Sequence, residues 1–271
     1  MKWGPINSEA ALKGLKDALK PLIGVEIKYL TIPREAAANF EPSQIGTIVG
    51  TLTDAVLPFI ALSKNVGLVK GAGILGDREG YPDFEHNSGY RMELKGLFID
   101  NPDVKLKKPP TKREPSARLT QKVTLKNIKP KQDALLILCY QLQPTKANPD
   151  LLTPIITDLE LFPVVECVKA RDFRLKSGGG VWFGDYETPT ILSKSGKIKA
   201  AAGKKLDYTT YGRKESEGRD FNEDTNFGKL KRIPYKPLHQ FLAKNGAHFA
   251  ARGGYPEDWI LDGGDDTDND D

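Results

Sequence analysis

An almost uninterrupted run of apolar residues, from Ala134 to Tyr140, constrains the fold of this chain most strongly. A β-strand with one face in water alternates apolar and polar side chains, whereas a strand covered on both faces reads as a continuous apolar run. The run therefore predicts a central strand with cover on both of its faces. The length of 271 residues is enough for one sizeable core around such a strand.

A strand pair is predicted upstream of this run. Apolar and charged residues alternate from position 90 to position 95, which puts the two kinds on opposite faces of a strand. The turn-forming sequence Asn87-Ser88-Gly89 comes directly before. Residues 81–99 are therefore expected to form a hairpin or two adjoining strands. The two faces are Tyr90, Met92 and Leu94 on one side and Arg91, Glu93 and Lys95 on the other.

Helical periodicity marks two segments near the N-terminus. Ser8 can cap a helix that continues with apolar residues at helical spacing until Pro21. A second helix is expected over residues 43–62. Another strand-like run covers residues 159–168. Together with the predicted strands, these helices favour an α/β fold.

Several classes of protein are disfavoured by the composition. No stretch approaches the roughly 18 consecutive apolar residues of a membrane span, and the N-terminus lacks a secretory pattern. The two cysteines, Cys139 and Cys167, lie in apolar surroundings. They are expected to be reduced core thiols of a cytoplasmic protein rather than a disulfide or a zinc site.

The charge distribution favours a polyanionic partner. The 40 basic and 36 acidic residues give a net charge of +4, but residues 262–271 hold six aspartates and no basic residue. The remaining 261 residues therefore carry 40 − 30 = +10. Much of this charge lies in the proline-rich segment 102–132, which is expected to be either a nucleic-acid-binding element or a solvated loop.

The candidate chemistry lies in the predicted strand pair. Asp83 follows a proline, and the triplet Glu93-Leu94-Lys95 begins ten residues later. Alternation puts Glu93 and Lys95 on one strand face, about 6.5 to 7 Å apart. Carboxylates on adjoining strands suit a hard divalent cation, which can activate water for hydrolysis of a phosphodiester, with a lysine beside it.

Two other acid-x-Lys triplets occur in the chain, Glu26-Ile27-Lys28 and Asp103-Val104-Lys105. Neither combines strand alternation with a preceding turn and a following buried strand, so the triplet at Glu93 is favoured. An alternative interpretation of Asp83, Glu93 and Lys95 is a surface ladder of opposite charges across a hairpin.

These residues resemble a known nuclease motif. Pro82-Asp83 followed by Glu93-Leu94-Lys95 is similar to the metal site of the PD-(D/E)XK nucleases. The longer string from Arg78 to Lys95, with its Arg-Glu-Gly and Asn-x-Gly turn, most resembles the PvuII-type restriction endonucleases. The similarity covers residues 77–100 and extends loosely through the strand at 134–140.

The resemblance implies a three-layer core, with a mixed central sheet flanked by helices, in a homodimer that cleaves duplex DNA with Mg²⁺. Asp83 and Glu93 would be metal ligands, together with the Leu94 carbonyl, and Lys95 would be the catalytic lysine. Glu79 corresponds to a further acidic position near the site.

DNA contacts are expected from two basic segments. Arg118, Gln121 and Lys122 lie in the stretch that corresponds to the base-reading segment of the PvuII group, although this stretch lacks the histidine of that group. Arg213 and Lys214 lie in a second segment that is basic, aromatic and glycine-rich.

The chain is therefore expected to be one endonuclease domain over residues 1–261 with an acidic disordered tail over 262–271. Within the domain, residues 1–75 form a helical part, 76–170 the catalytic core and 171–261 a DNA-contacting part. The expected function is that of a type II restriction enzyme. The alternatives are a DNA-repair nicking or structure-selective nuclease and a sequence-specific DNA-binding protein without catalysis.

Overall fold

The structure, a computed structural model, describes residues 1–71, 81–107, 117–119, 123, 125, 127–177, 181–183, 188–190 and 228–246. The chain divides into two compact units, and the predicted catalytic residues belong to the first. The first unit comprises Met1–Ala117, Lys129–Val164 and Gln240–Arg252, and the second comprises Arg118–Ile128, Val165–His239 and Gly253–Asp271.

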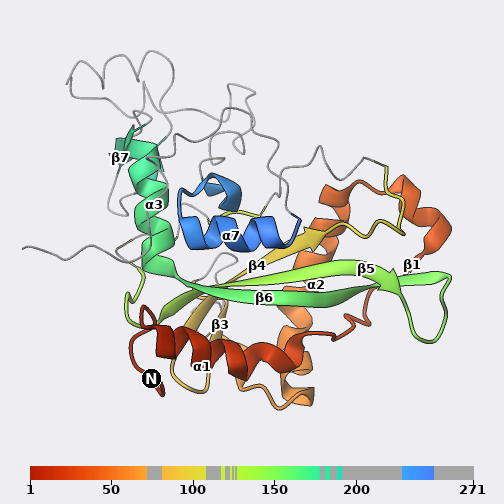
Figure 1. The fold of residues 1–271 in the computed structure, drawn as a ribbon, viewed down its shortest axis with the longest axis horizontal. Helices are drawn as coiled ribbons and strands as arrows, with labels where there is room; N and C mark the ends of the chain where they lie inside the picture. The colour runs from red at the N-terminus through yellow and green to blue at the C-terminus, as the bar shows by residue number, and fades with distance from the viewer. Residues whose placement is uncertain are drawn as a thin grey trace, which may run out of the picture. The chain divides into compact units, whose positions relative to one another are not determined.

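A six-stranded mixed sheet organises the first unit (Figure 1). Its strands follow the order β1-β6-β5-β4-β3-β2. Neighbouring strands are antiparallel except β4 and β5, which run parallel. The bounds are β1 Ile32–Pro33, β2 Leu68–Lys70, β3 Phe84–His86, β4 Arg91–Ile99, β5 Asp133–Pro144 and β6 Leu151–Pro163.

The predicted central strand is confirmed as β5. It pairs with β4 on one side and β6 on the other, and every residue from Asp133 to Tyr140 is buried. The predicted strand pair at 81–99 is confirmed as β3 and β4, joined by the turn at Asn87–Gly89. The continuous apolar run thus reports the burial of β5 on two faces. In β4 the alternation identifies the strand, but Glu93 on the charged face is buried as well as Met92 on the apolar face.

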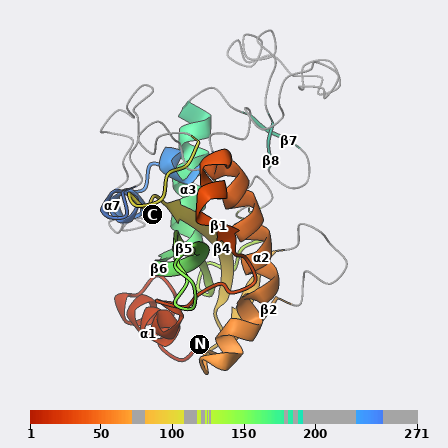
Figure 2. The ribbon, with the colours of Figure 1, turned by 90° about the vertical axis from the view of Figure 1, so that its right-hand side faces the viewer.

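Two helices and one face of the sheet form the main core. Helix α1 spans Glu9–Leu19, is capped by the Ser8 side chain, and leads into a short 3₁₀ turn over Lys20–Leu22. Helix α2 spans Pro42–Ser63 and packs against β2 and β4 (Figure 2). Both predicted helices are confirmed. The apolar side chains of α1 and α2 and alternate residues of the strands form one buried cluster, which is the main core. Its strand residues include Phe84, Met92, Leu136, Leu138, Leu159 and Leu161.

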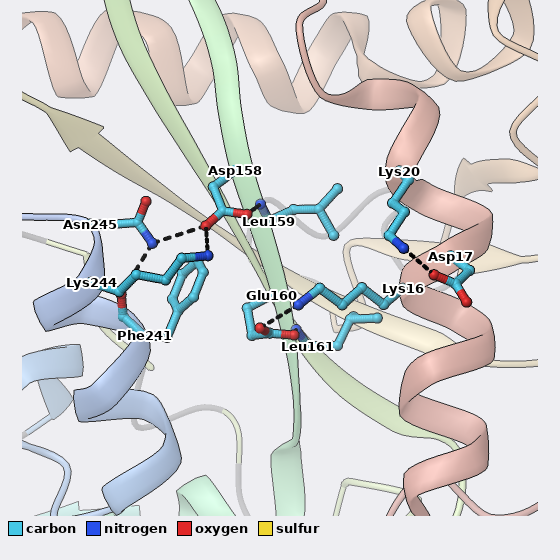
Figure 3. Close-up of polar contacts among 10 residues, drawn as sticks. All are labelled: Lys16, Asp17, Lys20, Asp158, Leu159, Glu160, Leu161, Phe241, Lys244 and Asn245. Atoms are coloured by element: carbon cyan, nitrogen blue, oxygen red, sulfur yellow. Dashed lines mark hydrogen bonds and ion pairs between the residues drawn. The ribbon is translucent and has the colours of Figure 1, made fainter.

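The end of a further helix contacts β6. Helix α7 spans Lys236–Lys244, and its Phe241 packs edge-on against Phe162, with ring centroids 6.0 Å apart. Figure 3 shows this helix and α1 on either side of β6. Lys244 donates to Asp158 at 2.9 Å, and Lys16 of α1 donates to Glu160 at 2.6 Å. Ion pairs therefore tie two helices to one strand.

The second unit contains helix α3, Val164–Ser177, which enters this unit at Val165. Two short strands, β7 (Val181–Phe183) and β8 (Thr188–Thr190), form an antiparallel pair. Arg171 is fully buried and bonds Asp172 at 2.8 Å. The remaining short elements are the 3₁₀ turns Arg34–Asn39 in the first unit and Leu230–Arg232 in the second.

One predicted strand is wrong in its second half. The apolar run at 159–168 was expected to be a single strand, but β6 ends at Pro163 and α3 begins at Val164. A short apolar run is compatible with a buried strand and with a buried helix, because all side chains are shielded from solvent in both.

The fold is mixed α/β, as predicted. The three-layer restriction-endonuclease-like core and the division of residues 1–261 into three parts stay predictions. One described helix, α2, is long and apolar enough to cross a membrane by length and composition. Both cysteines are free and buried, as the sequence indicates, and burial raises the pKa of each thiol.

Candidate active site

Asp83 and Glu93 lie opposite each other on two neighbouring strand segments. Strands β3 and β4 pair Phe84 with Met92 and Glu85 with Arg91. One further step along this antiparallel register places Asp83 across from Glu93. The Asp83 carboxylate accepts a hydrogen bond from the Leu94 backbone N–H at 2.7 Å. The register thus brings together two acids that are ten residues apart in sequence.

Lys95 completes this group from the same face of β4. Its Nζ lies 2.6 Å from Oε1 of Glu93. The Lys95 side chain is 16 % exposed and that of Glu93 only 7 %. A ladder of charges on an open surface would be far more exposed, so the alternative interpretation of these three residues as a surface ladder is wrong.

The local charge balance shifts the pKa of Asp83. Burial and the negative charge of Glu93 raise it to about 6, although the Lys95 ammonium and the Leu94 N–H act in the opposite direction. For Lys95, burial disfavours the ammonium, but the charges of Glu93 and Asp83 outweigh it and hold the pKa above its usual value. Lys95 is therefore a cation at neutral pH, and Asp83 carries an electrostatic penalty when ionised.

A third acid lies near this group and was not predicted. Asp54 of α2 forms an ion pair with Lys70 of β2, and its charge contributes to raising the pKa values of both Asp83 and Lys95. The sequence does carry a signal for it, because Asp54 is the only charged residue within Pro42–Ser63. A lone carboxylate in an otherwise uncharged helix needs a specific reason.

A buried network holds the segment that carries Asp83. Asp133, which is fully buried at the start of β5, accepts hydrogen bonds from the Tyr81 hydroxyl at 2.6 Å and from the Lys129 N–H at 2.7 Å. Arg91 donates to the same carboxylate at 2.9 Å. Burial, together with the charge and hydrogen bond of Asp133, raises the pKa of the Tyr81 phenol. The sequence carries no signal for this network, because Asp133 is more than 40 residues away from Tyr81 and Arg91.

The group supplies two carboxylates to a Mg²⁺ ion, which is the number that this ion commonly uses. Within the described ranges, no three His, Cys, Asp or Glu residues gather closely enough to hold a metal ion. Asp83 and Glu93 supply two carboxylates, and the Leu94 carbonyl shares the strand side on which its own N–H meets Asp83. Mg²⁺ commonly uses one or two carboxylates and keeps several waters. The mutual repulsion that raises the Asp83 pKa would be relieved by a cation, so the residues fit such an ion.

Most of the predicted DNA-contacting residues lie outside the part of the chain that the structure describes. Gln121, Lys122, Arg213 and Lys214 lie outside the described residues. So do Glu79, the further acidic position that the resemblance implies near the metal site, and the tail at 262–271. Arg118 lies in the second unit, half-buried, where it forms a β-bridge with Lys229.

The two rival triplets lie elsewhere. Glu26 forms a β-bridge with Ile155 beside β6, and Asp103 and Lys105 are exposed in the turn after β4. Both triplets therefore lie outside the β3–β4 pair.

Comparison with known proteins adds no relative. No protein family model, no curated protein and no solved structure matches this chain. The interpretation of the site therefore depends on its residues and their geometry.

Proposed function

We propose that this protein is a Mg²⁺-dependent endonuclease that hydrolyses phosphodiester bonds in duplex DNA, acting as a type II restriction enzyme. The observation that carries this proposal is the buried group in which Asp83 faces Glu93 while Lys95 bonds to Glu93 at 2.6 Å. The fold gives this proposal only general support: a mixed sheet lies between the α1–α2 core and the end of α7. We extend the proposal to a restriction-endonuclease-like core.

The residues of this group would have different roles in the hydrolysis. Asp83 and Glu93, with the Leu94 carbonyl, would hold Mg²⁺, which when bound lowers the pKa of water and offsets charge on the phosphate. Lys95, kept as an ammonium by the neighbouring acids, would donate to the attacking water or to a phosphate oxygen. The hydrogen bond from Leu94 keeps the Asp83 carboxylate oriented toward β4.

The substrate class follows from the charge of the chain. The 40 basic residues outnumber the acids outside the C-terminal tail by ten, and a basic surface attracts a polyanion. Two buried free cysteines favour a reducing, cytoplasmic location. Both points support an enzyme that acts on DNA inside the cell.

The test is incubation of the protein with supercoiled plasmid and phage DNA in Mg²⁺. Discrete fragments are expected from the wild type. We expect Asp83→Asn to abolish cleavage and Lys95→Ala to reduce it by about 10²- to 10³-fold, the range for loss of one preorganised electrostatic contact. Both variants should retain DNA binding in a mobility-shift assay.

A matched control separates the site from general charge effects. Glu26→Gln and Lys28→Ala make the same kinds of change in a rival triplet that lies beside β6, outside the β3–β4 pair, and both variants should cleave like the wild type. Undiminished cutting by Asp83→Asn would refute the assignment. Nicked circles without linear product would indicate the nicking nuclease, and intact plasmid with specific binding would indicate the non-catalytic DNA-binding protein.

A further inference from the structure

Helix α2 has a second apolar face that the described chain leaves exposed. Three large apolar side chains stand out, Ile48 at 38 %, Phe59 at 66 % and Leu62 at 79 % exposure. They belong to a row of exposed, uncharged residues spaced three and four apart, which we call the α2 seam: Gln44, Ile48, Thr51, Ala55, Phe59 and Leu62.

The α2 seam is less polar than its composition indicates. The Thr51 hydroxyl donates to the carbonyl of Thr47 at 2.9 Å, so its hydrogen bond is made within the helix. Asp54, the only charged residue of α2, lies about 100° around the helix from Ala55 and is paired with Lys70. Apart from the Gln44 amide, whose oxygen accepts a hydrogen bond from the Glu41 N–H at 2.8 Å, the seam therefore presents methyl, aliphatic and aromatic groups without charge.

The opposite face of α2 is already buried. Ile45, Val49, Leu57 and Ala61 belong to the main core and are fully covered. A helix that is apolar on all sides is normally buried on all sides, and a contiguous exposed apolar patch marks an interaction site. Figure 2 shows α2 with the strands of the sheet along one of its sides.

We propose that the α2 seam is the dimer interface of this protein and that a second copy of the same chain covers it. Spacings of three and four residues suit helix–helix packing, and the same row on a second helix interlocks with it. A symmetric dimer brings identical surfaces together, so a charged face would repel itself. The seam carries no charge, whereas 28 % of the chain's residues are charged.

The length of α2 would suit a bilayer as well as a partner helix, but its surroundings favour a protein partner, because its other face is already packed in the core. Its 22 residues span about 33 Å at 1.5 Å per residue. Helices that lie on membranes carry Lys and Arg on the polar face, and α2 contains neither.

This dimer would serve the proposed function, since cutting both strands of a duplex requires two sites. The interface stands on the features of α2 alone, so it can fail or succeed independently of the chemistry at Asp83. The oligomeric state tests the proposed interface, and cleavage by the Asp83 and Lys95 variants tests the proposed nuclease function.

The experiment measures the mass of the full-length protein by sedimentation velocity. The wild type is expected to be a dimer at micromolar concentration. Phe59→Glu with Leu62→Glu should raise the dissociation constant at least about 100-fold, because they replace two of the three large apolar side chains of the seam with charges. The control Tyr29→Glu, at a side chain that is 62 % exposed on another segment, should remain a dimer. Unchanged circular dichroism would show that each variant is folded.

A cross-linking measurement does not depend on destabilising the interface. Both native cysteines are buried, so a cysteine introduced by Ala55→Cys at the middle of the seam should form an intermolecular disulfide on mild oxidation. Tyr29→Cys should not. A monomeric wild type, a dimer that survives the double glutamate variant, or binding of the wild type to phosphatidylcholine vesicles through Phe59 and Leu62 would overturn the proposal.

Discussion

The pKa of Asp83 shows how strongly the ionisation of one side chain depends on its neighbours. Its carboxylate is held by the Leu94 N–H, which favours ionisation, yet burial and the charge of Glu93 raise its pKa to about 6. The same residue in a solvated turn would be ionised throughout the physiological range. The site therefore holds more negative charge than its single lysine balances, which is the condition under which a cation binds.

This raised pKa predicts a pH-dependent stability. Between the ordinary aspartate pKa of 3.8 and about 6, the folded protein binds more protons at Asp83 than the unfolded chain does, so the free energy of unfolding should fall as pH rises through this window. Above it, the metal-free protein carries a penalty of roughly 1–3 kcal/mol. Asp83→Asn should remove this penalty, and urea unfolding at pH 4.5 and pH 7.5 in EDTA measures it.

The effect of Mg²⁺ provides the control for this prediction. The ion favours ionised Asp83, so it should raise the melting temperature of the wild type more at pH 7.5 than at pH 5. It should leave Asp83→Asn nearly unchanged. An equal response of both proteins to Mg²⁺ would contradict this account.

Asp54 should act on the pH profile through its charge. Because its carboxylate helps to raise the pKa of Asp83, Asp54→Asn should lower that pKa and move the acid limb of the pH–rate profile to lower pH. Loss of packing alone would reduce the rate at every pH without moving the limb. Single-turnover cleavage rates measured from pH 5 to pH 8 distinguish the two effects.

At the scale of elements, the N-terminal segment is bound to the β3–β4 turn. The ring of Trp3 stacks on Tyr90 with centroids 6.0 Å apart, and the Tyr90 hydroxyl donates to the Gly4 carbonyl at 2.7 Å. Trp3 also lies against α1 at Gly14. These contacts connect the first helix to the strand that carries Glu93 and Lys95.

Two glycines in the helices should respond oppositely to the same substitution. A Cβ on Gly14 would lie 2.6 Å from the Trp3 ring, whereas one on Gly50 of α2 would meet nothing within 4 Å. Gly14→Ala should lower the free energy of unfolding by about 1–3 kcal/mol through overpacking. Gly50→Ala should raise it by about 0.5–1 kcal/mol, because alanine favours helix.

Urea denaturation of both variants in the same buffer measures this contrast. The pair controls for the general effect of adding a methyl group to a helix. Stabilisation by both substitutions would show that Trp3 does not pack against α1 as described.

At the scale of the whole molecule, charge is distributed unevenly along the chain. The ten C-terminal residues hold six of the 36 acidic residues, so the rest of the chain is strongly basic for its length. Binding to DNA should therefore depend on the release of counterions from phosphates.

Affinity for duplex DNA should fall steeply with salt. If six to ten phosphates are contacted, we expect a loss of about 10³- to 10⁵-fold between 50 and 200 mM salt. Fluorescence anisotropy in EDTA, where no cleavage occurs, measures it. An affinity that does not change with salt would show that the basic residues do not contact the phosphates.

The sequence by itself determined those features that depend on neighbouring residues. Alternation from position 90 identified β4, and the continuous apolar run identified β5, because the periodicity of burial is a local property of a strand. Asp83, Glu93 and Lys95 could be singled out as a group for the same reason, since one turn and one register connect them.

Only the tertiary structure decided what depends on distant segments. Asp54 and Lys70 come to the site through the packing of α2 against β2, and Asp133 joins Tyr81 to Arg91 across strands. The boundary at Pro163 between β6 and α3 likewise could not be inferred, because apolar residues are buried equally well in either element. Local periodicity records which residues are covered, whereas three-dimensional packing decides which segments cover them.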